Sequence, residues 1–374
     1  MTTEVTSKGW FQRLGEAIGG VLFGLILFLV AFPLLWWNEG NSVRRAQVLS
    51  QGRGAVVSIQ SDKVDSANEG KLVHLTGEAT SEGTLTDEEL GVSAPHALQL
   101  RRKVEMYQWK QNEEKETRKK LGGGEETVTK YTYEKVWSDE VIPSGDFKEA
   151  SSHQNPSEMP FQAEDLVAQD ATVGAFQLGE LTSQVDNWSS LSVQLTSEAE
   201  EAGLTEYQNG FYGGEKPGSP QIGDVRINYS EVKPGPVSVL AQQTGQGFSQ
   251  YQPKGSSSAI FDARVGTKTA DEMFTALEQE NAILTWILRV VGFFCMFIGL
   301  ALILRPISVM ADVVPLFGDL AEMGTGLVAF GTAATLSLIT IALAWVAARP
   351  LLGGLLLAGA AGAAFWLFTR RRKK

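Results

Sequence analysis

Residues 17–37 read AIGGVLFGLILFLVAFPLLWW and run directly into Asn38, Glu39 and Gly40. The run carries no charge, and a helix of this length covers about 30 Å, the thickness of the hydrocarbon core of a bilayer. A signal peptide has a shorter apolar core that ends at small residues, whereas this run ends at Trp36 and Trp37, which favour the membrane interface. The sequence therefore predicts a retained transmembrane helix with these tryptophans as anchors.

Further apolar runs occupy residues 286–304, 326–348 and 351–368 and predict spans two, three and four. Tryptophans stand near the ends of these runs, as is typical of an interfacial aromatic belt. They are Trp286 and Trp345, expected at the outer face, and Trp366, expected at the inner face. The predicted fold class is a multi-pass α-helical membrane protein with four spans and a large domain between spans one and two.

Basic residues set the predicted orientation, because loops rich in Lys and Arg stay in the cytoplasm. A smaller basic group follows span one, but it is outweighed by five basic residues after span four. These five are Arg370, Arg371, Arg372, Lys373 and Lys374. The predicted order is a cytoplasmic tail (1–16), span one (17–37), an extracytoplasmic domain (38–285), span two (286–304), a cytoplasmic amphipathic connector (305–325), span three (326–348), span four (351–368) and a basic cytoplasmic tail (369–374).

The net charge and the cysteine count of the 374 residues exclude some classes of protein. The net charge is −11, so the chain lacks the basic footprint of a nucleic-acid-binding protein. The single cysteine, Cys295, lies in an apolar run, so no intramolecular disulfide is possible. The outer domain must therefore be stabilised by its own core, for which about 250 residues suffice.

Alternation of apolar and polar residues predicts that the domain is α+β and mostly antiparallel β. Strands are expected at residues 72–79, 98–111, 127–142, 224–232, 236–244 and 259–266. The second and third of these flank Gly122–Gly124 and predict a long hairpin. Helix is expected loosely at 161–186, and again from Thr269, where Glu272 completes a capping box and the helix runs on into span two.

The sequence shows no motif for catalysis or for a cofactor, and no metal-ligand spacing. The three histidines are far apart; His74 alternates with apolar residues on a strand, His96 follows a proline, and His153 lies in a polar loop. A hydrolase using His153 is the third hypothesis for the function. The second is an oligomeric channel or channel regulator, for which span three offers a polar lining: Thr325, Thr332, Thr335, Ser337 and Thr340. Helix–helix hydrogen bonds explain the same hydroxyls.

Small residues four apart allow helices to approach closely. The candidates are Gly20 and Gly24 in span one, and Ala358 and Gly362 in span four. Packing within one bundle and self-association between copies explain them equally well.

Several stretches resemble the transmembrane protein 43 family, also called LUMA: residues 19–40, 68–79, 100–111, 153–161, 222–230 and 348–352. The resemblance implies four spans with a lumenal domain between spans one and two, self-association, and no established enzymatic activity. Animal members are residents of the endoplasmic reticulum and inner nuclear membrane, so a eukaryotic host implies a lumenal domain there. The short N-terminal tail and the Gly/Ala-rich fourth span indicate a bacterial member, with the domain in the periplasm.

The leading hypothesis is a non-enzymatic membrane scaffold. It predicts as partners the lipid bilayer, further copies of the chain and unidentified membrane or extracytoplasmic proteins, but no nucleic acid and no cofactor.

Overall fold

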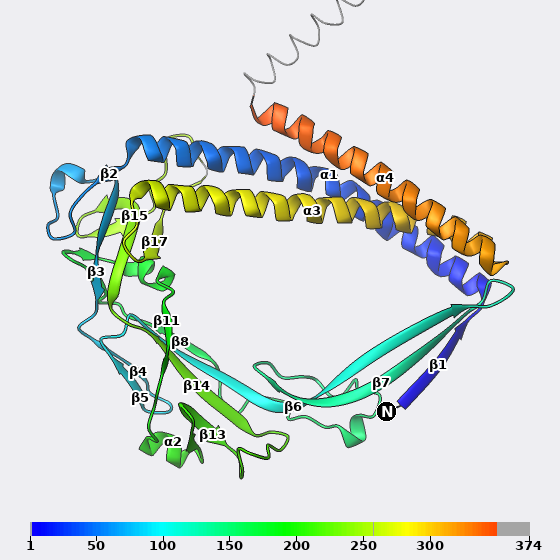
Figure 1. The fold of residues 1–374 in the computed structure, drawn as a ribbon, viewed down its shortest axis with the longest axis horizontal. Coiled ribbons are helices and arrows are strands. Elements are labelled where there is room, and N and C mark those ends of the chain that lie inside the picture. The colour runs from blue at the N-terminus through cyan, green and yellow to red at the C-terminus, as the bar shows by residue number, and fades with distance from the viewer. Residues whose placement is uncertain (1, 257, 350–374) are drawn as a thin grey trace, which may run out of the picture. The chain divides into compact units, whose positions relative to one another are not determined.

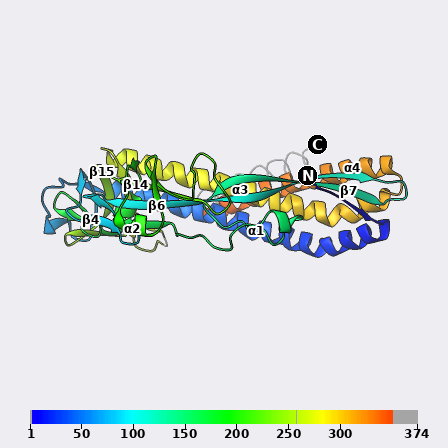
Figure 2. The same ribbon diagram turned by 90° about the horizontal axis from the view of Figure 1, so that it is seen from below.

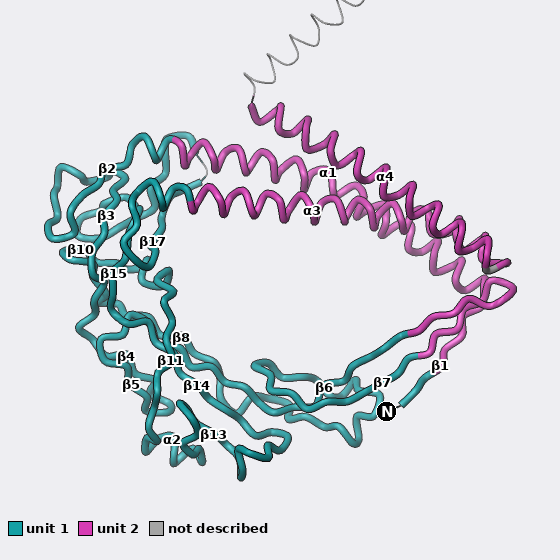
Figure 3. The backbone as a smooth tube through the Cα atoms, in the orientation of Figure 1, with its two compact units in different colours: residues 1–4, 51–115, 129–275 teal, residues 5–50, 116–128, 276–374 magenta. Residues whose placement is uncertain are grey.

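The computed structural model describes residues 2–256 and 258–349. The chain forms two compact units, which Figure 3 distinguishes by colour. The sheet unit consists of the described parts of residues 1–4, 51–115 and 129–275. The helix unit consists of the described parts of residues 5–50, 116–128 and 276–374.

The first sheet is antiparallel (Figure 1). Its strands are β1 (Thr2–Lys8), β6 (Gln99–Lys119), β7 (Glu125–Ser138), β8 (Glu164–Val167), β11 (Trp188–Leu191), β12 (Thr205–Tyr207), β13 (Gly210–Gly213) and β14 (Val225–Val232). They run in the order β1-β7-β6-β14-β13-β12, with β11 paired to β14 and β8 paired to β6. Alternate side chains of β14, such as Val225, Ile227 and Tyr229, are buried in the core of this sheet.

The second sheet has a core of its own, around Leu75, Val173 and Val239. Its strands are β2 (Val57–Ser58), β3 (Leu72–Thr80), β9 (Thr172–Val173), β10 (Phe176–Gln177), β15 (Gly235–Thr244), β16 (Gly247–Ser249) and β17 (Asp262–Val265). The order is β10-β9-β3-β15-β16, with β17 on β15, and β2 pairs in parallel with β3.

Short elements occupy the connections between these strands. They are the hairpin of β4 (Thr84–Asp87) and β5 (Val92–Pro95), helix α2 (Ser197–Glu201), and the 3₁₀ turns η1 (Ser66–Asn68), η2 (Ala150–Ser152) and η3 (Gly179–Gln184).

The structure confirms the predicted strands and the hairpin centred on Gly122–Gly124. Gly122 and Gly123 have φ of 88° and 78°, a conformation that suits glycine at the tip. The loosely predicted helix at 161–186 is wrong, because that segment holds β8, β9, β10 and η3. Gly174 and Gly179, with φ of 59° and 54°, interrupt it, and buried side chains such as Phe176 attach it to the second core.

Long helices dominate the helix unit: α1 (Trp10–Ala55), α3 (Ala270–Ala311) and α4 (Pro315–Ala348). The capping box that begins α3 is confirmed: the Thr269 amide donates to Glu272 Oε2 (2.7 Å) and the Glu272 amide donates to Thr269 Oγ1 (3.3 Å). α1 and α3 extend well beyond the predicted spans. The predicted connector at 305–325 is mostly helix, since α3 continues through Pro306 and only residues 312–314 separate it from α4.

α1 and α3 lie side by side in both Figure 1 and Figure 2. Gly24 and Gly299 make this possible, because a Cβ at Gly24 would stand 2.7 Å from the Gly299 carbonyl oxygen. Polar bonds continue the contact beyond the apolar run: Asn38 donates to the Thr285 carbonyl (3.1 Å), and Thr285 donates to Ser42 Oγ (2.8 Å). The helix pair is thus stabilised by close backbone approach and then by polar contacts.

Each of the three long helices contains a segment long and apolar enough to cross a membrane. The part of the chain that the structure describes therefore has three candidate spans, with a large, mostly antiparallel β domain between the first and the second. Predicted span four, at 351–368, lies outside the described residues.

Candidate functional site

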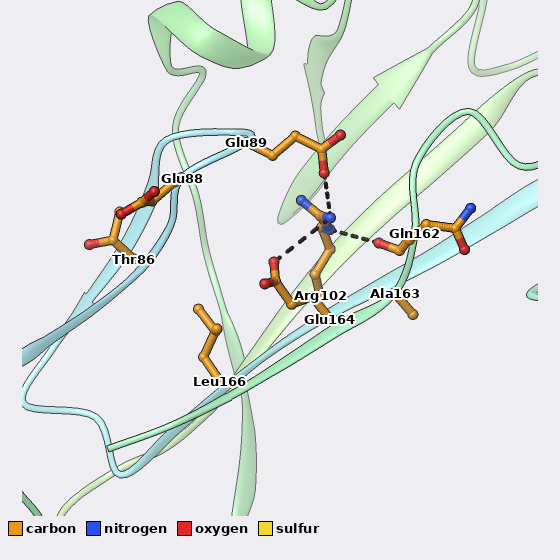
Figure 4. A pocket seen from close by; sticks show the side chains of 8 residues that line it. All are labelled: Thr86, Glu88, Glu89, Arg102, Gln162, Ala163, Glu164 and Leu166. Carbon is orange, nitrogen blue, oxygen red and sulfur yellow. Dashed lines mark hydrogen bonds and ion pairs between the residues drawn. The ribbon is translucent and has the colours of Figure 1, made fainter. Parts of the chain in front are cut away.

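A pocket of about 500 Å³ opens in the sheet unit beside Arg102, which lies on β6 (Figure 4). Alternation along β6 turns Leu100, Arg102 and Val104 to the same buried face, so the arginine occupies a position otherwise taken by core residues. Its side chain is 5% exposed. Burial of a charge at this position requires partners.

Arg102 has those partners. Its Nη1 donates to both Asp87 oxygens (2.9 and 2.7 Å), Nη2 to Glu89 (2.5 Å) and Nε to the Gln162 carbonyl (2.9 Å). Burial alone would lower the pKa of Arg102, but the charges of Asp87 and Glu89 raise it, so the guanidinium remains charged. Tyr229 also donates to Asp87 (2.5 Å), and burial together with this bond raises the Tyr229 pKa.

The rim of the pocket is acidic. Glu88, Glu89 and Glu164 are exposed around it, and Arg102 is the one cation among its lining residues, so the lining carries a net charge of −2. The guanidinium of Arg102 already donates its hydrogen bonds to Asp87, Glu89 and Gln162. A ligand in the pocket would therefore interact mainly with the exposed carboxylates. The arrangement suits a cationic group such as the side chain of a lysine or arginine.

Within residues 2–256 and 258–349, no group of three or more His, Cys, Asp or Glu side chains could hold a metal ion.

The histidines have three different environments. His74 is buried; its Nε2 donates to the Lys268 carbonyl (2.9 Å), and its Nδ1 lies 3.5 Å from Ser58 Oγ. Desolvation lowers the His74 pKa. The His96 ring contacts the Ser81 carbonyl (3.0 Å).

His153, named in the hydrolase hypothesis, stacks on Tyr133 with a centroid distance of 3.7 Å and meets the edge of Trp109. Its Nδ1 lies 3.1 Å from the Glu149 carbonyl oxygen and 3.0 Å from Ser152 Oγ. These contacts position the ring among aromatic side chains of the β6–β7 hairpin.

A second polar site, which we call the tip cluster, consists of Arg13, Lys119 and Asp312 in the helix unit. Arg13 binds Asp312 (2.6 Å) and donates to the Gly123 carbonyl (2.7 Å), and Lys119 binds Asp312 (3.0 Å). Burial alone would lower the pKa of Lys119, but bonds to Glu322, Asp319 and Asp312 raise it. The hairpin tip is thus attached to the start of α1 and to the α3–α4 turn.

The sequence analysis predicted neither the pocket beside Arg102 nor the tip cluster. Arg102 is detectable only as a charge on the apolar side of an alternating strand, and the tip cluster joins residues about 110 to 300 positions apart in the chain. The strand β1, paired with β7, was also missed, although TTEVTSK is rich in β-branched residues, which favour a strand.

The structure describes some of the predicted interface tryptophans and helix-packing residues, but not all of them. Trp36, Trp37 and Trp286 are exposed on their helices, and Trp345 is half-buried. A Cβ on Gly20 would lie 3.9 Å from Leu302, and Gly24 lies against Gly299. The remaining candidates lie outside the described residues: Ala358, Gly362, Trp366, Arg370, Arg371, Arg372, Lys373 and Lys374.

Hydroxyls of predicted span three bond mostly within the helices. Thr335 and Thr340 donate to carbonyls four residues earlier, and Ser337 packs on Met296 Sδ (3.6 Å). Thr325 lies 2.8 Å from Ser308 of α3. Among the described residues, these contacts give the channel hypothesis no observation in its favour.

Comparison with known proteins gives one consistent result. A family model described as "Transmembrane protein 43" matches residues 106–350. The human protein of that name is 36% identical over 371 residues, covering 95% of this chain and 91% of the relative, and the rat protein is 35% identical over 368 residues, covering 95% and 90%. A Drosophila melanogaster "Transmembrane protein 43 homolog" is 27% identical over 361 residues, covering 93% and 94%. No solved structure matches.

Proposed function

Because the chain belongs to the transmembrane protein 43 family, we propose that it is a non-enzymatic membrane scaffold. Its long apolar helices anchor it, and its β domain binds another protein. The observation that carries the proposal is the open acidic pocket beside Arg102. Pockets for small molecules are mostly apolar, whereas exposed carboxylates around a satisfied ion pair suit a basic side chain presented by a protein.

The test uses full-length protein in native membranes with a photocrosslinking residue at Ala163 in the pocket wall. We expect crosslinks to a peptide containing lysine or arginine. Their yield should fall about tenfold in the triple variant Glu88→Gln, Glu89→Gln, Glu164→Gln, because three exposed ion pairs of about 0.5 kcal/mol each together contribute on the order of 1.4 kcal/mol.

The matched control is Glu158→Gln, Glu180→Gln, Glu201→Gln, which removes the same charge at exposed positions away from the pocket. Equal loss in both triple variants would show a general charge effect and reject the pocket as the binding site.

Self-association is part of the proposal. Gly24 is already covered by Gly299 of the same chain, so contacts between copies must use other surfaces. The mass in lipid nanodiscs is expected to be that of a defined multimer, and a clean monomer would remove this part of the proposal.

The orientation proposed is the one expected from the sequence, with the β domain outside the cytoplasm and the α3–α4 turn inside. The helices are apolar on most sides, as spanning helices are. This orientation separates the hairpin tip from the α3–α4 turn, because the charged stretch KQNEEKETRKK at residues 110–120 cannot cross hydrocarbon. We infer that the tip cluster and the β1–β7 pairing open when the helices insert into a bilayer.

A further inference from the structure

A second pocket, of about 200 Å³, lies within the helix unit where α1, α3 and α4 come together. It is lined by polar residues at or near the ends of the apolar runs, including Glu39, Ser42, Thr285, Arg289 and Arg349. The described chain thus has a polar hollow enclosed by the ends of its candidate spans.

The charges in this pocket leave one cation in excess. Glu39 is 1% exposed and is bound by Arg289 through two bonds, Nε to Oε1 (2.6 Å) and Nη2 to Oε2 (2.8 Å). This pair is internally neutral. Arg349 adds a positive charge, so the lining carries a net charge of +1.

The guanidinium of Arg349 has N–H donors that the described part of the chain leaves unused. Its guanidinium lies over the Trp345 ring, 4.5 Å from the centroid, and makes no hydrogen bond or ion pair with the residues that the structure describes. A cation at the end of α4 also complements the helix dipole, but that interaction needs none of the five guanidinium N–H groups.

The surroundings of the pocket are those of a membrane interface. Arg289 stacks on Trp286, 4.7 Å from the centroid, and Trp286 is 63% exposed. Apolar side chains near the same helix ends, Ile287 of α3 and Leu343 of α4, are exposed as well. Tryptophan favours the depth of the lipid headgroups. An anion in the pocket would therefore have an apolar surface next to it for attached acyl chains.

We propose that this pocket binds the phosphate group of an anionic phospholipid. Arg349 supplies guanidinium donors that no described residue uses, in the planar fork that suits phosphate oxygens. Arg289 remains paired to Glu39 and neutralises the one carboxylate that would repel the phosphate, and the exposed apolar side chains contact the acyl chains. The shared chemistry is a phosphate, so a lipid must be distinguished from free phosphate.

The experiment is native mass spectrometry of the full chain released from nanodiscs of phosphatidylcholine containing phosphatidic acid. We expect a retained phosphatidic acid adduct, reduced about five- to tenfold by Arg349→Gln. Arg118→Gln, which removes an exposed arginine on β6, should leave the adduct unchanged. Equal melting temperatures in pure phosphatidylcholine would show that both variants are folded.

A wild-type level of adduct in Arg349→Gln would overturn the proposal. Millimolar inorganic phosphate is the second arm: failure to displace the adduct supports a lipid site. Displacement that depends on Arg349 would show a site for free phosphate and overturn the lipid assignment.

Discussion

At the scale of single residues, the ion pair of Arg102 and Asp87 shows how a charge can occupy a core position. Neither side chain is exposed, and Tyr229 shares the same carboxylate. The sequence placed residues 98–111 on a strand correctly, but the partner Asp87 comes from a separate short hairpin. Alternation indicates which side of a strand is buried, whereas the identity of a partner depends on tertiary contacts.

We predict that Asp87→Asn lowers the free energy of unfolding by about 3–5 kcal/mol, because it leaves Arg102 charged and short of a buried partner. Glu88→Gln, at the exposed neighbouring position, should change it by less than about 0.5 kcal/mol. Denaturant unfolding of the purified protein measures both, and equal effects would contradict a buried role for Asp87.

The buried His74 should make the stability of the folded protein depend on pH. Desolvation lowers its pKa below the ordinary value of 6.5, so above pH 6.5 the residue is neutral both folded and unfolded. As the pH falls below 6.5, the unfolded chain binds a proton that the folded chain resists, and stability falls by at most about 1.4 kcal/mol per pH unit. Melting temperatures between pH 7.5 and 5.5 should fall more steeply for wild type than for His74→Asn, and parallel curves would contradict this.

At the scale of elements, the patterns that were predictable are the strongly periodic ones. The long hairpin, the capped start of α3 and three apolar helices follow from alternation, a capping box and hydrophobic length. The error at 161–186 arose because short strands with irregular spacing have no clear period, and tertiary pairing with β6 and β3 decided their form.

The packing of α1 on α3 gives a prediction for two glycines of one helix. Gly24→Ala should destabilise the protein by about 1–3 kcal/mol, because the added Cβ would stand 2.7 Å from the Gly299 oxygen. Gly19→Ala, with nothing within 4 Å, should be neutral or stabilising by up to about 1 kcal/mol. Thermal unfolding in detergent compares them, and the reverse order would show that the helices do not pack this way.

In the molecule as a whole, three long apolar helices are the candidate membrane anchors of the β domain. The bounds of the apolar runs were readable from the sequence, since lipid imposes a length and a composition. The tip cluster was not readable, because Arg13, Lys119 and Asp312 lie in separate polar segments with no common motif. The tip cluster binds the hairpin tip to the α3–α4 turn, whereas the proposed orientation in a bilayer separates the two.

We propose that the helices carry the β domain to the side of the membrane opposite the α3–α4 turn. It is tested by labelling single cysteines with an impermeant maleimide on sealed cells, after Cys295→Ala removes the native thiol. The positions are Leu121 at the tip, which is 86% exposed, Glu82 in the β domain and Val314 in the turn. We predict that cysteines at Leu121 and Glu82 label from one side and that a cysteine at Val314 labels only after permeabilisation. Labelling at Leu121 and Val314 from the same side would contradict the claim, because it would show that the tip cluster persists in the membrane-bound protein.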